Sequence, residues 1–156
     1  MDLFTERLIP KKITGKDVAL SALWRVAALI ISALSFVFLG FAAIIITAAA
    51  LYGAYYFISG ILLVEYEYTL TNEELDIDKI IAKRKRVCLK SYNVKDFTGG
   101  GKYDGRKAEI LCPDETSENL YYLEIGEGAK KECIVIDPNE TMFKAFTLYM
   151  GQKFKR

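Results

Sequence analysis

The sequence of 156 residues contains no histidine, which removes the commonest general base and the commonest metal ligand of proteins. Its three cysteines, Cys88, Cys112 and Cys133, are an odd number and form no C-x-x-C pair. This pattern argues against a disulfide framework and against a zinc site. We expect each cysteine to fill a strand position as a small buried apolar residue, which suits a reducing compartment. We therefore predict no catalytic residue, no metal and no cofactor.

Charge and proline are absent from the whole stretch between Arg25 and Glu65. At a rise of about 1.5 Å per residue, one helix through it would be roughly 58 Å long. The hydrocarbon core of a bilayer is about 30 Å thick and is spanned by about 20 residues. One crossing is therefore too few for this length, and three do not fit. We predict a transmembrane helical hairpin over residues 17–64, with helices at about 17–39 and 43–64 and a turn around Gly40.

The first of these helices has to include residues from the polar side of the stretch. Residues 26–39 alone are too few to cross a bilayer, so the helix must carry Trp24 and Arg25 within it. An arginine near a helix end can extend its guanidinium to the headgroups, and tryptophan prefers the same layer. We therefore expect Trp24 and Arg25 at the membrane interface.

Charged residues are concentrated in the second part of the chain. Residues 1–64 hold eight of the 41 charged residues, and residues 65–156 hold the other 33, of which 16 are basic and 17 acidic. A net charge near zero argues against a nucleic-acid-binding protein. The sequence therefore joins a membrane segment to a water-facing domain.

The positions of lysine and arginine predict the orientation in the membrane. Basic residues flank both ends of the hairpin, and the connecting turn has none. By the positive-inside rule, both termini face the cytoplasm, and the protein is a multi-pass protein of the cell (inner) membrane. Residues 1–16 then form a cytoplasmic N-terminal tail, either a short interfacial helix or a disordered segment.

From Glu65 onward, apolar and polar residues alternate with a period of two, which is typical of half-buried strands. About seven short strands follow, with a glycine-rich loop at Gly99–Gly105. The last element is an amphipathic helix that begins after Asp137 as the cap, carries Pro138 in its first turn and ends near Gly151. Such a helix can cover the open end of a strongly bent antiparallel sheet.

Three segments together resemble the opening of bacterial PH-like (pleckstrin-homology-like) domains. They are Tyr68–Ile77, which follows the pattern Y-x-L-T-x-x-x-L-x-I, then Ile80–Arg86, in which Ala82 replaces a customary glycine, and Val94–Phe97. Two membrane helices followed by such a domain is similar to one architecture of small bacterial membrane proteins. The resemblance implies a membrane-anchored α+β protein. Its transmembrane hairpin would precede a cytoplasmic PH-like domain at residues 65–156, a seven-stranded bent antiparallel β-barrel with a C-terminal helix. It implies little about function, because fold does not fix activity.

The strongest electrostatic feature is the basic run Lys83-Arg84-Lys85-Arg86. It serves either as a topology signal on a solvated strand or as a contact for anionic headgroups, where each charge is worth about 1 kcal/mol. A second candidate anion site is Lys102 with Arg106, beside the glycine-rich loop. That loop lacks the spacing of a phosphate-binding loop, and Tyr103 stands where Ser or Thr is needed.

Carboxylates occupy alternate positions of two neighbouring predicted strands, at Glu65, Glu67, Asp76 and Asp78. They form either the solvated face of a hairpin or a site for hydrolysis or cation binding.

The leading functional hypothesis is a non-enzymatic membrane protein that presents a cytoplasmic PH-like module for contact with a protein or with anionic lipid. The alternative is a small accessory subunit of a larger membrane complex, of the transporter or secretion type, whose helices make the key contacts. A third hypothesis is a hydrolase that uses the hairpin carboxylates. The partners expected are membrane lipids and a protein partner or a second copy of the chain, with no nucleic acid.

Overall fold

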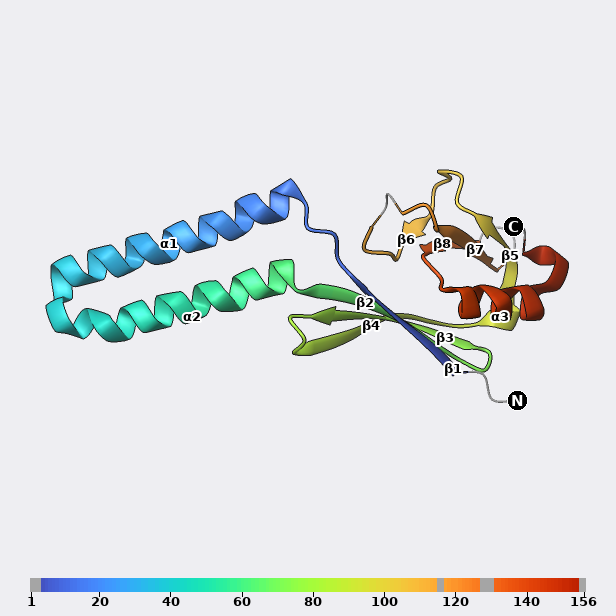
Figure 1. The fold of residues 1–156 in the computed structure, drawn as a ribbon, viewed down its shortest axis with the longest axis horizontal. Helices are drawn as coiled ribbons and strands as arrows, with labels where there is room; N and C mark the ends of the chain where they lie inside the picture. Colours follow the sequence, from blue (N-terminus) through green and yellow to red (C-terminus); the bar gives the residue numbers. More distant parts are fainter. Residues whose placement is uncertain (1–3, 115–116, 127–130, 155–156) are drawn as a thin grey trace. The chain divides into compact units, whose positions relative to one another are not determined.

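The computed structural model of the chain describes residues 4–114, 117–126 and 131–154, which form two compact units (Figure 1). The helix unit comprises Lys11–Val64 together with the turn Ile81–Lys85. The sheet unit comprises Met1–Pro10, Glu65–Ile80 and Arg86–Arg156.

Helices α1 (Gly15–Leu39) and α2 (Ala43–Leu62) of the helix unit lie side by side and are joined by the 3₁₀ segment η1 (Gly40–Ala42) (Figure 1). Helix α1 begins two residues earlier than predicted, because the Thr14 hydroxyl and the Asp17 carboxylate each accept a hydrogen bond from the other's backbone N–H.

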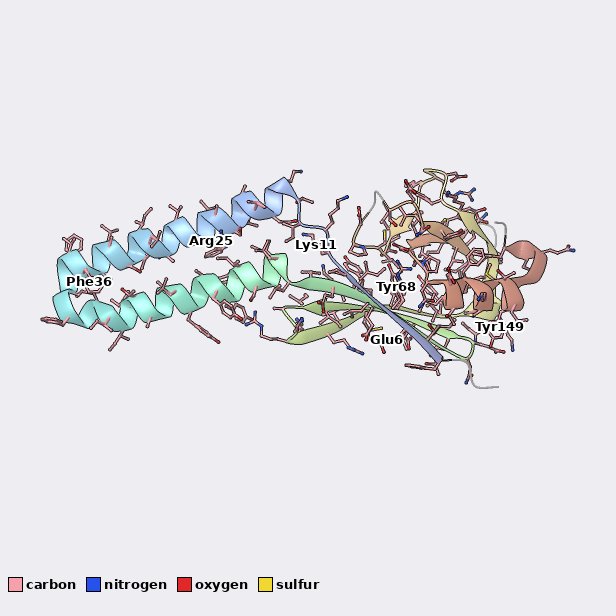
Figure 2. All side chains as sticks on the ribbon, in the orientation of Figure 1. Glu6, Lys11, Arg25, Phe36, Tyr68 and Tyr149 are labelled. Atoms are coloured by element: carbon pink, nitrogen blue, oxygen red, sulfur yellow. The ribbon has the colours of Figure 1, made fainter. Side chains whose placement is uncertain are left out.

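The buried side chains between α1 and α2 are all small, which lets two helices approach closely. The buried residues are Ser21, Ala28 and Ser35 of α1 and Ala43, Ala54 and Ser59 of α2. Most large apolar side chains point away from this contact on both helices, as Figure 2 shows, although the rings of Trp24 and Phe57 stack on each other between the helices. By length and composition, Gly15–Leu62 is the segment of the described chain that could cross a membrane.

The sheet unit contains two open four-stranded sheets. The first has the order β1 (Phe4–Pro10), β2 (Val64–Thr71), β3 (Glu74–Ile81) and β4 (Lys85–Asn93). The second has the order β5 (Phe97–Lys102), β7 (Tyr121–Ile125), β8 (Glu132–Ile136) and β6 (Glu109–Ile110).

The predicted closed, fully antiparallel barrel of seven strands is therefore wrong. Within the described residues, no ladder joins β4 to β5, because the 3₁₀ turn η2 (Val94–Asp96) separates them. Strand β6 pairs in parallel with β8.

The prediction of a tail or interfacial helix for residues 1–16 is also wrong where the structure describes them. Strand β1 pairs antiparallel with β2 over its whole length, from Phe4 opposite Thr71 to Pro10 opposite Glu65. It covers what would otherwise be an open edge of β2. Met1–Leu3 lie outside the described residues.

The first part of the predicted glycine-rich loop, residues 99–102, lies instead in strand β5, which pairs with β7, whereas residues 103–105 lie outside any strand. A Cβ atom on Gly100 would lie 2.7 Å from the ring of Phe154, and Gly100 forms a single parallel bridge with that residue. The glycines therefore serve close packing of the C-terminal segment against β5.

Helix α3 (Glu140–Met150) begins after Asn139, whose side chain accepts the backbone N–H of Met142. Asp137, the predicted cap, pairs instead with Arg7 of β1 at 2.9 Å. The sheet unit has one main core, to which the first sheet contributes Tyr68, Leu70, Leu75 and Ile77, the second sheet Phe97, Leu123, Ile134 and Ile136, and α3 Met142 and Phe146.

Candidate functional site

The basic run lies at a tight turn between β3 and β4. Ala82 and Lys83 have φ values of +52° and +54°, and the backbone N–H of Arg84 donates to the Ile81 carbonyl at 3.0 Å. Two consecutive left-handed residues are typical of a type I′ hairpin turn, which favours Asn and Gly. Ala82 thus keeps a backbone conformation for which glycine is the usual residue.

This turn is bound to the last turns of α2, within the helix unit. The Ala82 N–H donates to the carbonyl of Leu63. The Arg84 guanidinium donates to Ser59 Oγ at 2.7 Å and to the Tyr56 carbonyl at 3.3 Å, and it lies 4.3 Å from the centre of the Tyr56 ring. A cation at a helix C-terminus complements the helix dipole, and the aromatic face adds to the attraction. Arg84 therefore binds the turn to the helix.

Arg86 has different partners, on the sheet unit. Its guanidinium contacts the Glu67 carboxylate of β2 and lies 3.5 Å from the Asp78 carboxylate of β3. The structure therefore divides the predicted four-residue cluster: Arg84 binds a helix and Arg86 binds carboxylates. Lys83 and Lys85 are exposed and have no ion pair within the described part of the chain.

The second predicted anion site is largely neutralised. Arg106 pairs with Asp104 at 2.7 Å and with Glu124 at 2.8 Å, and it lies 3.7 Å from the centre of the Tyr122 ring. The Arg106 guanidinium lowers the pKa of Asp104 to about 2. Only the exposed Lys102 of the predicted pair is left to meet an anion.

The two residues predicted for the membrane interface lie on α1. The Trp24 ring stacks on Phe57 of α2, with centroids 4.3 Å apart and planes 7° apart. Arg25, the next residue, is exposed on the surface of α1 (Figure 2).

Two of the four hairpin carboxylates, Glu67 and Asp78, lie beside the Arg86 guanidinium. Glu67 is 5% exposed, and burial, followed by a hydrogen bond that the protonated Glu67 carboxyl group donates to Glu6, raises its pKa. Arg86 partly opposes this rise. No described group of three or more Cys, Asp and Glu side chains is placed to hold a metal.

The surroundings of the three cysteines differ from the prediction of uniform burial. Cys112 is buried, Cys133 is half-buried and Cys88 is exposed. Cys88 lies on β4, an edge strand of its sheet.

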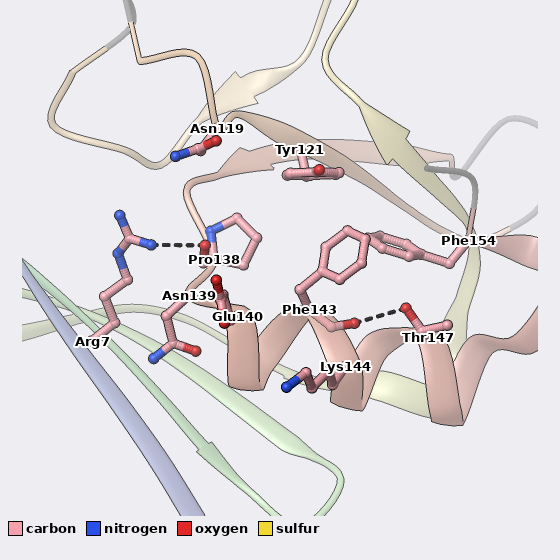
Figure 3. Close-up of a pocket in the computed structure, with 10 residues that line it drawn as sticks. All are labelled: Arg7, Asn119, Tyr121, Pro138, Asn139, Glu140, Phe143, Lys144, Thr147 and Phe154. Carbon is pink, nitrogen blue, oxygen red and sulfur yellow. Dashed lines mark hydrogen bonds between the residues drawn. The ribbon is translucent and has the colours of Figure 1, made fainter.

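The sheet unit also holds a cavity of about 890 Å³ that the sequence did not predict (Figure 3). One wall is aromatic, with mutual ring contacts among Tyr121, Phe143 and Phe154. The polar part of the lining is Arg7, Asn119, Asn139, Glu140, Lys144 and Thr147. The described lining combines this aromatic wall with charged and amide side chains and contains neither a cysteine nor a serine.

The side chain of Arg7, which lines this cavity, is held in place by two contacts. Its guanidinium donates to the Pro138 carbonyl at 2.7 Å and pairs with Asp137. The cavity was missed because it depends on β1 and on the C-terminal segment, which meet at positions more than 100 residues apart in the sequence. Residues 4–9 show no alternation of apolar and polar residues, so that signal of a strand was missing for β1.

Comparison with protein-family models gives one match, to the family described as "Bacterial PH-like domain (DUF6106)", over residues 1–156. Neither the curated proteins nor the solved structures contain a significant match to this chain. Because the family model covers the whole chain, the helical segment and β1 are as much part of the family pattern as the sheets. The chain belongs to the bacterial PH-like domain family DUF6106.

Proposed function

We propose that this protein is a non-enzymatic protein of the cell membrane that presents its PH-like domain on the cytoplasmic side, for contact with a protein or with anionic lipid. Helices α1 and α2 hold it in the bilayer, and both termini lie in the cytoplasm. PH-like domains are in general non-catalytic, which supports the non-enzymatic role.

One observation carries the proposal: the helix unit has an apolar surface along its length and a basic end. Apart from Arg25, its basic residues lie before α1 or at its first turn, or in the turn bound to α2; they are Lys11, Lys12, Lys16, Lys83, Arg84 and Lys85. The backbone N–H of Lys11 donates to the Val64 carbonyl at 2.7 Å, so the start of α1 and the end of α2 lie together. An apolar surface ending in cations is suited to a bilayer with an anionic cytoplasmic leaflet.

The membrane part of the proposal is tested by alkaline carbonate extraction of membranes that contain the full chain. We expect the protein to stay in the membrane pellet, because the outward apolar side chains of α1 and α2 need acyl chains around them. Release into the supernatant would refute membrane anchoring.

Contact with anionic lipid is assigned to Lys83 and Lys85, because Arg84 and Arg86 are already bound within the protein. At about 1 kcal/mol per charge, the loss of both lysines should weaken the retention of anionic phospholipid by roughly 2 kcal/mol. Native mass spectrometry of the protein released from mixed neutral and anionic nanodiscs measures this retention.

The variant K83Q/K85Q should retain fewer anionic lipids than the wild type. K144Q/K153Q, which removes two lysines of the sheet unit, is the matched control and should retain as many as the wild type. Equal loss in both variants would show that lipid retention depends only on net charge, which would contradict the assignment to Lys83 and Lys85. No loss in either variant would refute the lipid contact.

The alternative function, a small accessory subunit of a larger membrane complex, is favoured by one face of α2. Ala49 is exposed, and a Cβ atom on Gly53 would have no neighbour within 4 Å, so a further helix has room to approach. Crosslinking with mass spectrometry separates the alternatives. Partner or self crosslinks to residues 43–62 favour the subunit, and crosslinks to the sheet unit favour the interaction module.

A further inference from the structure

The turn of the helix pair is the most apolar part of the helix unit. Residues 36–46 contain no polar side chain. Several of the side chains there are highly exposed, with Val37 at 78%, Phe38 at 79% and Phe41 at 92%. A turn that enters water normally carries polar turn residues such as Asn, Asp or Ser, whereas the turn residue here is Gly40, which has no polar side chain.

The backbone of this turn is also suited to an environment without water. The N–H of Gly40 donates to the Phe36 carbonyl, and the N–H of Ala43 donates to the carbonyls of Gly40 and Phe41. The chain reverses through 3₁₀ geometry instead of an open loop. In lipid, backbone polar groups need such partners within the protein.

Interfacial residues lie at another level of the two helices. The Trp24 ring stacks on the Phe57 ring. Arg25 follows Trp24 on α1, and Tyr56 precedes Phe57 on α2, with the Arg84 guanidinium over the Tyr56 ring. Tryptophan, tyrosine and arginine are the residues that favour the boundary between headgroups and hydrocarbon. We refer to Trp24, Arg25, Tyr56, Phe57 and Arg84 as the interfacial belt.

The distance from the interfacial belt to the turn is too short for a complete crossing. From Arg25 to Leu39, and equally from Phe57 back to Ala43, the helix rises over 14 residues, or about 21 Å. The hydrocarbon core is about 30 Å thick. A belt at the cytoplasmic boundary therefore leaves the turn about 9 Å short of the outer boundary.

The opposite placement, with Gly15 and Leu62 at the cytoplasmic boundary, puts Arg25 about 15 Å deep, at the centre of the bilayer. A guanidinium is among the costliest groups at that depth. It would also expose Phe41 and its neighbours to the outside water. Both consequences favour the belt as the boundary.

We infer that the hairpin enters the bilayer from the cytoplasmic face only, and that its turn, residues 39–43, ends among acyl chains of the outer leaflet and does not reach the outside water. The inference rests on the proposed membrane anchoring, and it concerns how far the hairpin extends into the bilayer. The surface formed by residues 36–46 is thus an acyl-chain-binding surface, and the protein displays no residue of its turn on the outer side.

Trp24 is the only tryptophan of the chain, so its fluorescence reports the belt directly. The full-length protein is reconstituted in vesicles that contain phospholipids brominated either near the headgroup or near the acyl-chain end. Wild-type emission should be quenched more strongly by the shallow bromines. The variant Phe41→Trp in a Trp24→Phe background moves the single tryptophan to the turn, where the deep bromines should quench more strongly and aqueous iodide should have little effect.

Two other results would overturn the inference. Strong iodide quenching of the single tryptophan in the Phe41→Trp variant would place the turn in water, and stronger quenching of Trp24 by the deep bromines would place the belt near the bilayer centre. Either result leaves membrane anchoring intact if carbonate extraction still retains the protein. Release by carbonate would instead refute the anchoring itself. The variant Phe36→Trp in the same background, one helical turn before Gly40, checks that the result is not particular to position 41.

Discussion

The helix unit and the sheet unit use the same apolar residue types in opposite ways. Phe41 of the helix unit is 92% exposed, whereas Phe97 and Phe146 of the sheet unit are 1% and 0% exposed. In the sheet unit, aromatic and aliphatic side chains pack against one another, and in the helix unit small residues make the internal contact. This difference indicates that the two units are built for two different solvents. Each of the following predictions tests the structure of one of the two units.

The largest effect is expected from truncation of a core side chain. Phe146→Ala removes a fully buried ring that contacts Phe97 and Phe154, and it should lower the free energy of unfolding of the sheet unit by about 3–5 kcal/mol. Phe41→Ala, the same substitution in the helix unit, should leave that free energy unchanged. Denaturant titration followed by tyrosine absorbance checks the pair. Equal losses would contradict the separation of the two units.

The next effect concerns the packing of Phe154 on β5. Gly100→Ala forces the Phe154 ring and Leu123 to move, at an expected cost of about 1–3 kcal/mol. In the background Phe154→Ala the same substitution should cost less, because the ring that its Cβ meets is gone. A double-mutant cycle measured by thermal unfolding gives the coupling. Additive costs would show that the glycine does not serve this contact.

The helices of the helix unit could be predicted from the sequence, whereas the glycine-rich strand of the sheet unit could not. The charge-free run and Gly40 predicted helices at 17–39 and 43–64, and α1 and α2 run from Gly15 to Leu39 and from Ala43 to Leu62. Helical periods and chain reversals depend on local residues, so they are visible in one sequence. The prediction failed where a distant partner decides the structure. Three consecutive glycines are typical of a loop, and it is pairing with Leu123 of β7, more than 20 residues later, that makes Gly100 a strand position.

The candidate site shows the same limit. The basic run was visible as charge, but its division between Arg84 and Arg86 depends on the left-handed backbone at Ala82 and Lys83. On a regular strand, alternate residues would share a face. The cavity beside Arg7 could not be predicted, because its lining joins Arg7 to residues between positions 119 and 154, which are distant from it in the sequence.

A smaller effect tests the attachment of the basic turn to α2. Arg84→Ala removes the bonds to Ser59 and Tyr56, which we expect to be worth about 1 kcal/mol. The Ala82 amide should then exchange with deuterium roughly fivefold faster. Lys83→Ala, on the neighbouring exposed residue, is the control and should leave this rate unchanged. The same acceleration in both variants would mean that Arg84 does not hold the turn.

The smallest effect concerns pH and the sheet unit alone. Because burial and Glu6 raise the pKa of Glu67, the protonated form is favoured in the folded state. Its stabilising effect is complete below the ordinary carboxyl pKa of 4.5 and is lost as the pH rises through the raised value. Glu67→Gln should therefore make the decline in unfolding free energy with rising pH shallower. An unchanged slope in denaturant titrations between pH 4 and 8 would contradict this effect.

The central claim is that acyl chains cover the exposed apolar surface of the helix unit and leave the sheet unit untouched. It is tested most directly by photolabelling of the full-length protein in vesicles that contain a phospholipid with a carbene-generating group at the end of one acyl chain. The account predicts adducts on outward residues of the helix unit, such as Val37, Phe38, Phe41 and Ile45, and none on Leu70, Phe97 or Phe146. Adducts spread over the sheet unit, or an unlabelled helix unit, would contradict it.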